Sequence, residues 1–363
     1  MKSEKDRDNL FIFWYCLKLI GINVSLRREA SFCSKIYKYF IIFLILLYLT
    51  LSSRNNFMAL MILNYIPAFH SITTLATLLM HLCLLKEIPN LKILRKMINK
   101  LSETNNKKTV YFIMYTLMFL SFLLLIVVPV AFIFIFKMTT VKHRMFGFHS
   151  IFIENLMICF GNVLYIFLCI TIPTVLTCVF YAVCYQWREI IKCLKEDIKS
   201  FGFKGFVDPN QIEKAKYLVN KYRYLWKGTK LLKDTFKNFL FFYITMLMLK
   251  MFLNYSVFVK IAGNIQCIPY LIIFSFYFIF SVYVASSIPE EMEELVFCLE
   301  NILEEITLTG YEARFQINKY LKLILNKQPV VLSMGGFAEL RRGFIFATFG
   351  SLLSYGIIIL QNG

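Results

Sequence analysis

Residues 264–288 read NIQCIPYLIIFSFYFIFSVYVASSI, and the six residues that follow, 289–294, read PEEMEE. The first segment holds no charged side chain and is long enough to cross a bilayer, since about 20 apolar residues in a helix span the hydrocarbon core. The second segment places four carboxylates directly after it, as expected where a membrane helix continues into water. This stretch therefore predicts an α-helical membrane protein.

Apolar runs of this kind recur along the whole chain. Hydrophobic residues make up 58% of the sequence and its mean hydropathy is +0.63, more apolar than a soluble domain of this length. The expected fold class is an all-α membrane protein with seven transmembrane helices. We place them near residues 37–53, 57–85, 110–136, 150–185, 238–259, 264–288 and 344–361. No small-residue cleavage site follows the short apolar stretch 10–17, so we expect the first span itself to direct insertion.

Basic residues are divided unequally between the two sides of these spans. Lys and Arg number 33 on one side and five on the other, and two more fall within spans. Loops rich in Lys and Arg stay on the cytoplasmic side of a membrane. We therefore expect a cytoplasmic N-terminus and an extracellular C-terminus in the cell membrane, a result that holds when residues 186–237 are left out.

The loops on the basic side are long and have helical patterns. The expected organisation is a cytoplasmic N-terminal segment (1–36), spans one to four (37–185), a cytoplasmic helical loop (186–237), spans five and six (238–288), a second cytoplasmic helical segment (289–343) and the last span (344–363). Glycines and Pro209 indicate a helix break at 201–210. We expect spans four, five and six to continue as helices into the cytoplasm.

Charge differs sharply between two of these extensions. Residues 290–312 hold eight acidic residues and no basic one, whereas 211–237 is rich in Lys. The acidic extension of span six is expected to pack beside the basic helix that leads into span five, and an apolar seam favours this packing: Leu295, Leu299, Ile302 and Ile306. Two separately solvated charged faces are the alternative, because exposed ion pairs contribute little.

Several function classes are excluded by composition and spacing. A net charge of +18 would indicate a nucleic-acid partner in a soluble protein, but the topology accounts for it, and no nucleic acid is expected. The ten cysteines lack the spacing of a zinc site or disulfide framework, and the four histidines form no metal-ligand pair with a carboxylate. With no phosphate loop or nucleophile motif, we expect no enzyme activity, no metal and no cofactor.

Residues that are polar except for one isoleucine recur at helical spacing on one side of the last span. They are Thr348, Ser351, Ser354, Tyr355, Ile358, Gln361 and Asn362, opposite Leu352, Leu353, Ile357, Ile359 and Leu360. Helix packing through small residues explains such a stripe, and the stripe alone favours that interpretation. The alternative is a water-filled path lined by hydroxyls and amides, with a hydrophobic ring as gate.

The end of the chain resembles the insect gustatory and odorant receptors. Their last helix carries Thr-Tyr, five apolar residues and Gln-Phe, and here Ser354-Tyr355 are followed by residues 356–360 and Gln361-Asn362. Residues 334–340, MGGFAEL, resemble the G-F-x-x-L segment that precedes that helix. The resemblance is tight over about the last 30 residues and is one of architecture elsewhere.

This resemblance implies a ligand-gated, non-selective cation channel in the lipid bilayer. Four subunits, identical or mixed with related receptors, would surround a pore lined by the last helix, and the cytoplasmic extensions would form a shared anchor. By motif position Gln361 is the pore-ring glutamine, with Ile358 and Asn362 at the gate positions and Ser354 and Tyr355 completing the set. Asn362 departs from the family's apolar residue, and an amide ring does not dewet a pore as a phenylalanine ring does. Either Ile358 then forms the hydrophobic constriction of the pore, or the pore has no such constriction.

A pocket for a small-molecule tastant or odorant is implied among the outer halves of spans two to six. Candidate residues are polar or aromatic groups in that region: Tyr65, His70, Glu154, Asn155, Tyr165, Tyr270 and Tyr277. Ionisable groups within a membrane are costly and are therefore functional candidates. The alternative places Glu154 at the external interface and His70 in a helix contact.

Three other functions compete with this one. A G-protein-coupled receptor also has seven spans, but its N-terminus is external, and its Asp-Arg-Tyr and Asn-Pro-x-x-Tyr motifs are missing here. A transporter predicts paired halves, yet no internal repeat relates residues 1–185 to 186–363. A diverged homologue without channel activity is the third alternative, and Asn362 is its main support.

Overall fold

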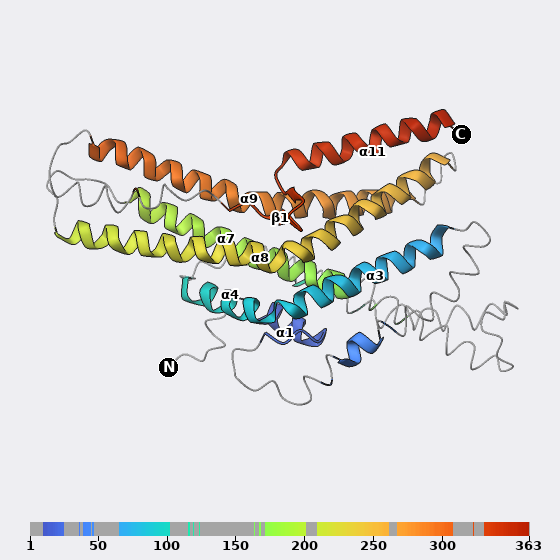
Figure 1. Ribbon diagram of the computed structural model, residues 1–363, viewed down its shortest axis with the longest axis horizontal. Coiled ribbons are helices and arrows are strands. Elements are labelled where there is room, and N and C mark those ends of the chain that lie inside the picture. Colours follow the sequence, from blue (N-terminus) through green and yellow to red (C-terminus); the bar gives the residue numbers. More distant parts are fainter. Residues whose placement is uncertain are drawn as a thin grey trace, which may run out of the picture. The chain divides into compact units, whose positions relative to one another are not determined.

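The computed structural model describes residues 10–24, 65–101, 171–200, 209–260, 267–307 and 330–362, with scattered residues at 36–46, 115–123, 163–167 and 322. These parts are helical except for one short hairpin, as expected for the predicted fold class (Figure 1). The chain divides into two compact units, residues 1–92 with 106–182, and residues 93–105 with 183–363. Each unit is described by itself.

The described part of the first unit includes a short helix, α1 (Phe11–Leu19). Phe13 and Leu17 are buried on one of its faces, and the Phe13 ring lies 4.9 Å from that of Tyr115. The helix ends because Gly21 adopts a left-handed conformation, with φ of 88°. Its amide and that of Ile22 then donate to the carbonyls of Lys18 and Leu17, the Schellman arrangement that satisfies a helix C-terminus.

Three further helices lie in or begin in this unit. They are α3 (Tyr65–Lys86), α4 (Ile88–Leu101) and α7 (Ile172–Lys199). Helix α3 lies within the predicted second span and ends one residue past it. Helix α7 begins inside the predicted fourth span and continues well beyond residue 185, so the expected helical extension of this span is confirmed. The expected break follows it, because the next helix starts at Pro209.

The second unit is built on two long helices. Helix α8 (Pro209–Lys260) joins the Lys-rich segment to the predicted fifth span, and α9 (Cys267–Thr307) joins the sixth span to the acidic segment. Both run unbroken, as expected, and they pack against each other. Helix α9 continues through Pro289, which removes one backbone donor. The hydroxyls of Ser286 and Ser287 donate to carbonyls in the preceding turn.

Apolar length identifies some of the predicted spans. Within the described residues, Glu213–Ser256 and Leu271–Asn301 are long and apolar enough to cross a membrane, and Leu75–Lys86 and Gly343–Ile358 are shorter apolar helices. These segments coincide with parts of predicted spans two, five, six and seven. Most of predicted spans one, three and four lies outside the described residues, and the residues that are described there are helical.

A two-stranded hairpin precedes the last helix. Strands β1 (Ser333–Met334) and β2 (Ala338–Glu339) pair antiparallel, with Met334 opposite Ala338. Gly335 and Gly336 have φ of 62° and 87°, conformations that side chains other than Asn or Asp rarely adopt. The helix that follows, α11 (Gly343–Asn362), coincides with the predicted seventh span and packs on α8 and α9.

Close packing joins α4, α7 and α8 within the second unit. The buried Trp187 indole donates to the Thr229 hydroxyl over 2.9 Å. A Cβ added to Gly228 would overlap the Trp187 ring and would lie 2.9 Å from the Met97 methyl group. Glycine at 228 therefore allows the α8 backbone to approach this ring.

Candidate functional site

The last helix has one face in contact with its own chain. Thr348, Leu352 and Gly356 are buried there, and the Tyr355 ring lies 3.9 Å from that of Phe252 on α8. A Cβ on Gly356 would overlap the Tyr255 ring of α8. This face is fixed by close approach to α8.

A different face of α11 is exposed within the single chain. We define the exposed strip as Ser351, Ser354, Ile358 and Gln361, which are separated by three, four and three residues and so share one side of the helix. The Ser351 and Ser354 hydroxyls each donate to the carbonyl four residues earlier, over 2.9 Å. The strip combines small polar groups with one apolar residue.

The stripe expected from the sequence is divided between the packing face and the exposed strip. Thr348 is buried and Tyr355 is half-buried against α8, so both belong to the packing face and not to the exposed strip. Leu353 and Ile357, expected on the opposite side, are exposed as well. The direction from which α8 approaches sets this division, and helical spacing alone does not contain it. The side chain of Asn362 lies outside the described residues.

The hairpin fixes the start of α11 against α8. The Gly335 amide donates to the Lys237 carbonyl of α8 over 2.9 Å, and a Cβ on Gly335 would lie 3.3 Å from the Phe241 side chain. The Phe337 ring lies 5.6 Å from that of Phe241. The MGGFAEL segment is therefore a connector between α8 and the last helix.

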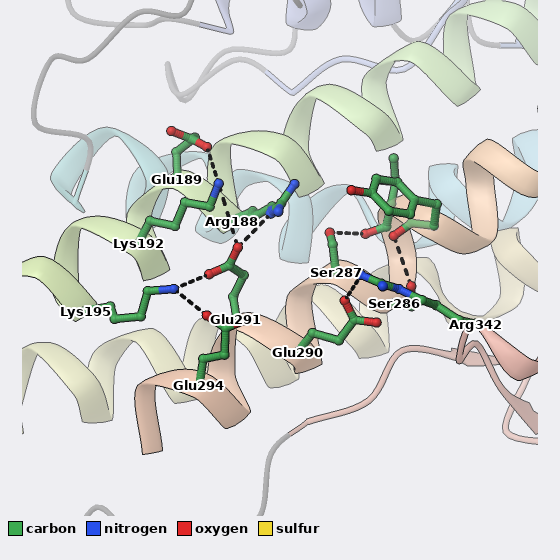
Figure 2. Close-up of polar contacts among 12 residues, drawn as sticks. Arg188, Glu189, Lys192, Lys195, Ser286, Ser287, Glu290, Glu291, Glu294 and Arg342 are labelled. Carbon is green, nitrogen blue, oxygen red and sulfur yellow. Dashed lines mark hydrogen bonds and ion pairs between the residues drawn. The ribbon is translucent and has the colours of Figure 1, made fainter. Parts of the chain in front are cut away.

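Arg342 connects the same junction to α9. Its guanidinium pairs with the Glu290 carboxylate (Figure 2) and lies 5.5 Å from the centroid of the Tyr283 ring. The preceding Arg341 pairs with Glu339 of the hairpin over 3.0 Å. Sequence reasoning did not single out Arg342; two arginines directly before an apolar span were the available signal.

A buried carboxylate joins α9 to α7. Glu291 is 8% exposed and accepts hydrogen bonds from Arg188 Nε at 3.1 Å and Lys195 Nζ at 2.8 Å, with Lys192 Nζ at 3.7 Å (Figure 2). Lys195 also pairs with Glu294 at 2.7 Å. The three cations are spaced four and three residues apart along α7, which places them on one face.

Electrostatics keep this carboxylate charged. Burial by itself would raise the pKa of Glu291, but the hydrogen bonds from Lys195 and Arg188 outweigh it, and the pKa lies below its ordinary value of 4.5. The acidic segment does pack, as its apolar seam indicated, since Leu295 and Leu299 are buried. The ion pairs identified for Glu291 and Glu294 run to α7, not to the Lys-rich part of α8 that the sequence favoured.

The residues expected to form a ligand pocket are only partly described. Tyr277 on α9 is half-buried, with its ring 6.4 Å from that of Phe276. Tyr65, His70 and Tyr270 lie in α3 and α9, but their side chains lie outside the described residues, as do Glu154, Asn155 and Tyr165 altogether. The set therefore stays a prediction. In the described ranges no group of three or more His, Cys, Asp or Glu side chains is placed to hold a metal ion.

The chain is similar to chemosensory receptors. The family described as 7tm chemosensory receptor matches residues 11–362. No curated protein matches the sequence. The solved insect olfactory receptor OR5 from Machilis hrabei matches with a TM-score of 0.74 at 15% identity, covering 99% of each chain. Its complex with eugenol matches with a TM-score of 0.72 at 14% identity, covering 98% of each chain. At this identity the likeness establishes a shared fold.

Proposed function

Because the chain belongs to the 7tm chemosensory receptor family, in the insect chemoreceptor superfamily, we propose that it is a gustatory-type receptor that conducts cations without selectivity when a small tastant or odorant binds. The family is one of multi-pass membrane receptors and not a class of enzymes. The Machilis hrabei receptor of the same fold is solved in complex with eugenol, which supports a small organic molecule as the ligand.

The exposed strip of α11 carries the proposal that this helix lines a pore. In a single chain the strip faces away from α8 and α9, and its hydroxyls and amide suit a water-filled path. Four copies arranged around these strips, identical or mixed with related receptors, would enclose the path. Gln361 would then form a ring of amides and Ile358, one turn before it, a ring of apolar side chains.

The proposed topology follows from the basic residues. With 33 Lys and Arg on one side and five on the other, the N-terminus is cytoplasmic, the C-terminus is extracellular, and Gln361 lies at the outer end of the pore. The extensions at 186–237 and 289–343 form the cytoplasmic anchor of the assembly. The ligand pocket lies among the outer halves of spans two to six, with the seven candidates Tyr65, His70, Glu154, Asn155, Tyr165, Tyr270 and Tyr277.

Current recording from cells that express the full chain tests this function. Tastants and odorants should elicit a cation current whose conductance changes in Gln361→Ala and Ile358→Ala. Leu353→Ala is the matched control, because Leu353 is 62% exposed on α11 but lies off the strip. Equal effects of all three substitutions would contradict the assignment of the strip to the pore.

A diverged homologue without channel activity is the second candidate. Asn362 favours it, because an amide stands where the resemblance implies an apolar gate residue. Symmetry of the purified assembly separates the two functions. A four-fold assembly around the last helix supports the channel, whereas a surface-expressed monomer that gives no current with any ligand supports the homologue. Epitope tags at both termini test the topology. An external N-terminus would exclude both the channel and the diverged homologue.

A further inference from the structure

Three basic side chains are exposed on one side of the Lys-rich part of α8. Arg223, Lys227 and Lys230 are separated by four and three residues, so they share one side of the helix. We call these three residues the basic face. In the part of the chain that the structure describes, no carboxylate forms an ion pair with any of them. The basic face therefore presents its cations to solvent.

Helix α9 has an exposed face of the opposite charge. Glu293, Phe297 and Glu300 are also separated by four and three residues, and we call them the acidic face. The Phe297 side chain is 61% exposed between the two carboxylates. Neither carboxylate has an ion pair among the described residues. The basic and acidic faces, whose residues are all described, therefore make no ion pair with each other within one chain.

The two faces match in spacing as well as in charge. In each face the two outer charges are seven residues apart, about 10.5 Å along a helix. Helices α8 and α9 are separated along the chain only by residues 261–266 and pack against each other, so they run in opposite directions. Antiparallel alignment of a basic face with an acidic face places Arg223 opposite Glu300 and Lys230 opposite Glu293.

The two faces also lie at nearly the same level along the helices. The Ser275 hydroxyl of α9 contacts the Met251 sulfur of α8 at 3.5 Å, which fixes the register of the two helices. Lys230 stands 21 residues from Met251, and Glu293 stands 18 residues from Ser275. The difference of three residues is about 4.5 Å, which the flexible stem of a lysine can span. Copies related by rotation about the membrane normal keep their levels, so the basic face of one copy can meet the acidic face of the next.

We propose that the basic face of α8 binds the acidic face of α9 on a second copy of this chain. This inference rests on the proposed assembly of four subunits and names the surfaces that join neighbours in its cytoplasmic anchor. Different surfaces of identical chains form a heterologous contact, which closes into a ring when the rotation allows it. At the centre of each contact the Lys227 stem covers the Phe297 ring, and its ammonium is attracted to the ring face.

Charge reversal in the purified full chain tests this contact without requiring a current. The α8 reversal combines Arg223→Glu with Lys230→Glu, and the α9 reversal combines Glu293→Lys with Glu300→Lys. Each places like charges opposite each other at every contact, which is unfavourable. By mass photometry in detergent, each reversal should raise the chain concentration at which half of the tetramer has dissociated by about tenfold or more.

A matched control separates this effect from net charge. Lys96→Glu combined with Lys199→Glu makes the same change in net charge as the α8 reversal, at exposed positions of α4 and α7. This control should dissociate as the wild type does. Both reversals combined in one chain restore opposite charges at each contact, so the combined variant should recover the wild-type assembly.

Co-expression of the two reversals with different tags tests the head-to-tail arrangement. When the two kinds of chain alternate around a ring, an acidic α8 meets a basic α9 at one contact and a basic α8 meets an acidic α9 at the next. Chains that fail to assemble alone should therefore form tetramers with two copies of each. Their recovery also shows that each reversed chain is folded.

Three outcomes would overturn the proposal. They are a wild-type chain that stays monomeric, an α8 reversal that assembles as the control does, and reversals whose assembly is recovered neither in one chain nor by co-expression. Recovered tetramers without any ligand-elicited current would contradict the channel and leave the contact intact. Unchanged tetramers of either reversal that still give a current would contradict the contact and leave the channel intact, so the two proposals fail separately.

Discussion

The α7–α9 ion cluster and the exposed strip of α11 place polar groups in opposite situations. Around Glu291 the charged groups find partners within the chain, and the carboxylate is buried. Along α11 the strip residues are exposed, although the helix around them is apolar. Polar groups on an apolar helix are costly in lipid. The first region is therefore complete within one chain, whereas the second is left exposed by it.

A matched pair of glycine substitutions should give the largest contrast between packed and exposed regions. Gly228→Val inserts a side chain into the space of the Trp187 ring, whereas no atom lies within 4 Å of a Cβ added to Gly350 on α11. Overpacking a core costs about 3 kcal/mol or more in severe cases, so we expect Gly228→Val to unfold or strongly destabilise the purified chain. Gly350→Val should leave the melting temperature of the monomer unchanged.

The oligomeric state of the chain provides a second measurement for the two glycine variants. Because Gly350 borders the exposed strip, Gly350→Val should alter the oligomer or its conductance while the monomer stays folded. If the Gly350→Val monomer melted at as low a temperature as Gly228→Val, the strip would be a packing face within the chain. That result would contradict the difference between the packed region at Gly228 and the exposed strip.

Removing the buried Glu291 carboxylate should have the next largest effect on the stability of the protein. Glu291→Gln leaves three cations without their central partner, and because Arg188 and Lys192 are 27% and 30% exposed we expect a loss of about 2 kcal/mol, below the range for fully buried pairs. Glu293→Gln is the control, because that side chain is exposed. Equal melting temperatures for the two variants would contradict a structural role for the cluster.

The same variant makes a prediction about pH. A carboxylate whose pKa is lowered on folding stabilises the protein above its unfolded pKa, and this stabilisation is lost as the pH falls. The difference between wild type and Glu291→Gln should be full at pH 7 and should shrink below about pH 4.5, the ordinary value for this group. Thermal melting at a series of pH values measures it, and a difference that does not depend on pH would contradict the assignment.

Breaking one buried hydrogen bond should lower the stability of the protein by less than removing the Glu291 carboxylate does. Thr229→Val keeps the shape of the side chain but leaves the Trp187 N–H without the hydroxyl that accepts from it at 2.9 Å, a loss of about 1 to 2 kcal/mol. Thr235→Val is the control, because its buried hydroxyl donates to the Leu231 carbonyl of its own helix. We expect the first variant to melt at a lower temperature than the second, and the reverse order would count against this contact.

Removing the Arg342–Glu290 ion pair at the start of the last helix should have the smallest effect on stability. Arg342 and Glu290 are 58% and 35% exposed, and exposed pairs contribute about 0.5 kcal/mol. Arg342→Ala should therefore melt almost as the wild type does. If the junction couples α9 to α11 in the proposed channel, Arg342→Glu should shift the concentration of ligand that gives half-maximal current, and the reciprocal Glu290→Arg substitution should restore it. A double variant that is no closer to wild type would exclude this coupling.

Several elements follow from local sequence and were predicted. The unbroken helices α8 and α9, the break between α7 and Pro209, and the last helix each depend on apolar length, helical spacing and helix-breaking residues. The candidate strip was found only in part. Ser351, Ser354, Ile358 and Gln361 share one exposed side, but Thr348 and Tyr355 do not, because α8 contacts them.

The contacts between distant segments were not predictable in the same way. The sequence offered Glu291 a choice of basic partners, and proximity in the folded chain selected Arg188 and Lys195 of α7 over the lysines of α8. The fit of Gly228 against Trp187, and the contact of the hairpin with Phe241, depend on two backbones approaching from different directions. No spacing within either segment contains that information.

The sequence by itself determined that this chain is a helical membrane protein, how its basic residues divide, and which family it belongs to, because hydropathy, charge and motif are properties of consecutive residues. The tertiary structure decided which face of the last helix is packed and which is exposed, which cations surround Glu291, and that Gly228 lies against the Trp187 ring. Each of these depends on the relative placement of two helices, which follows from packing across the fold and not from either helix alone.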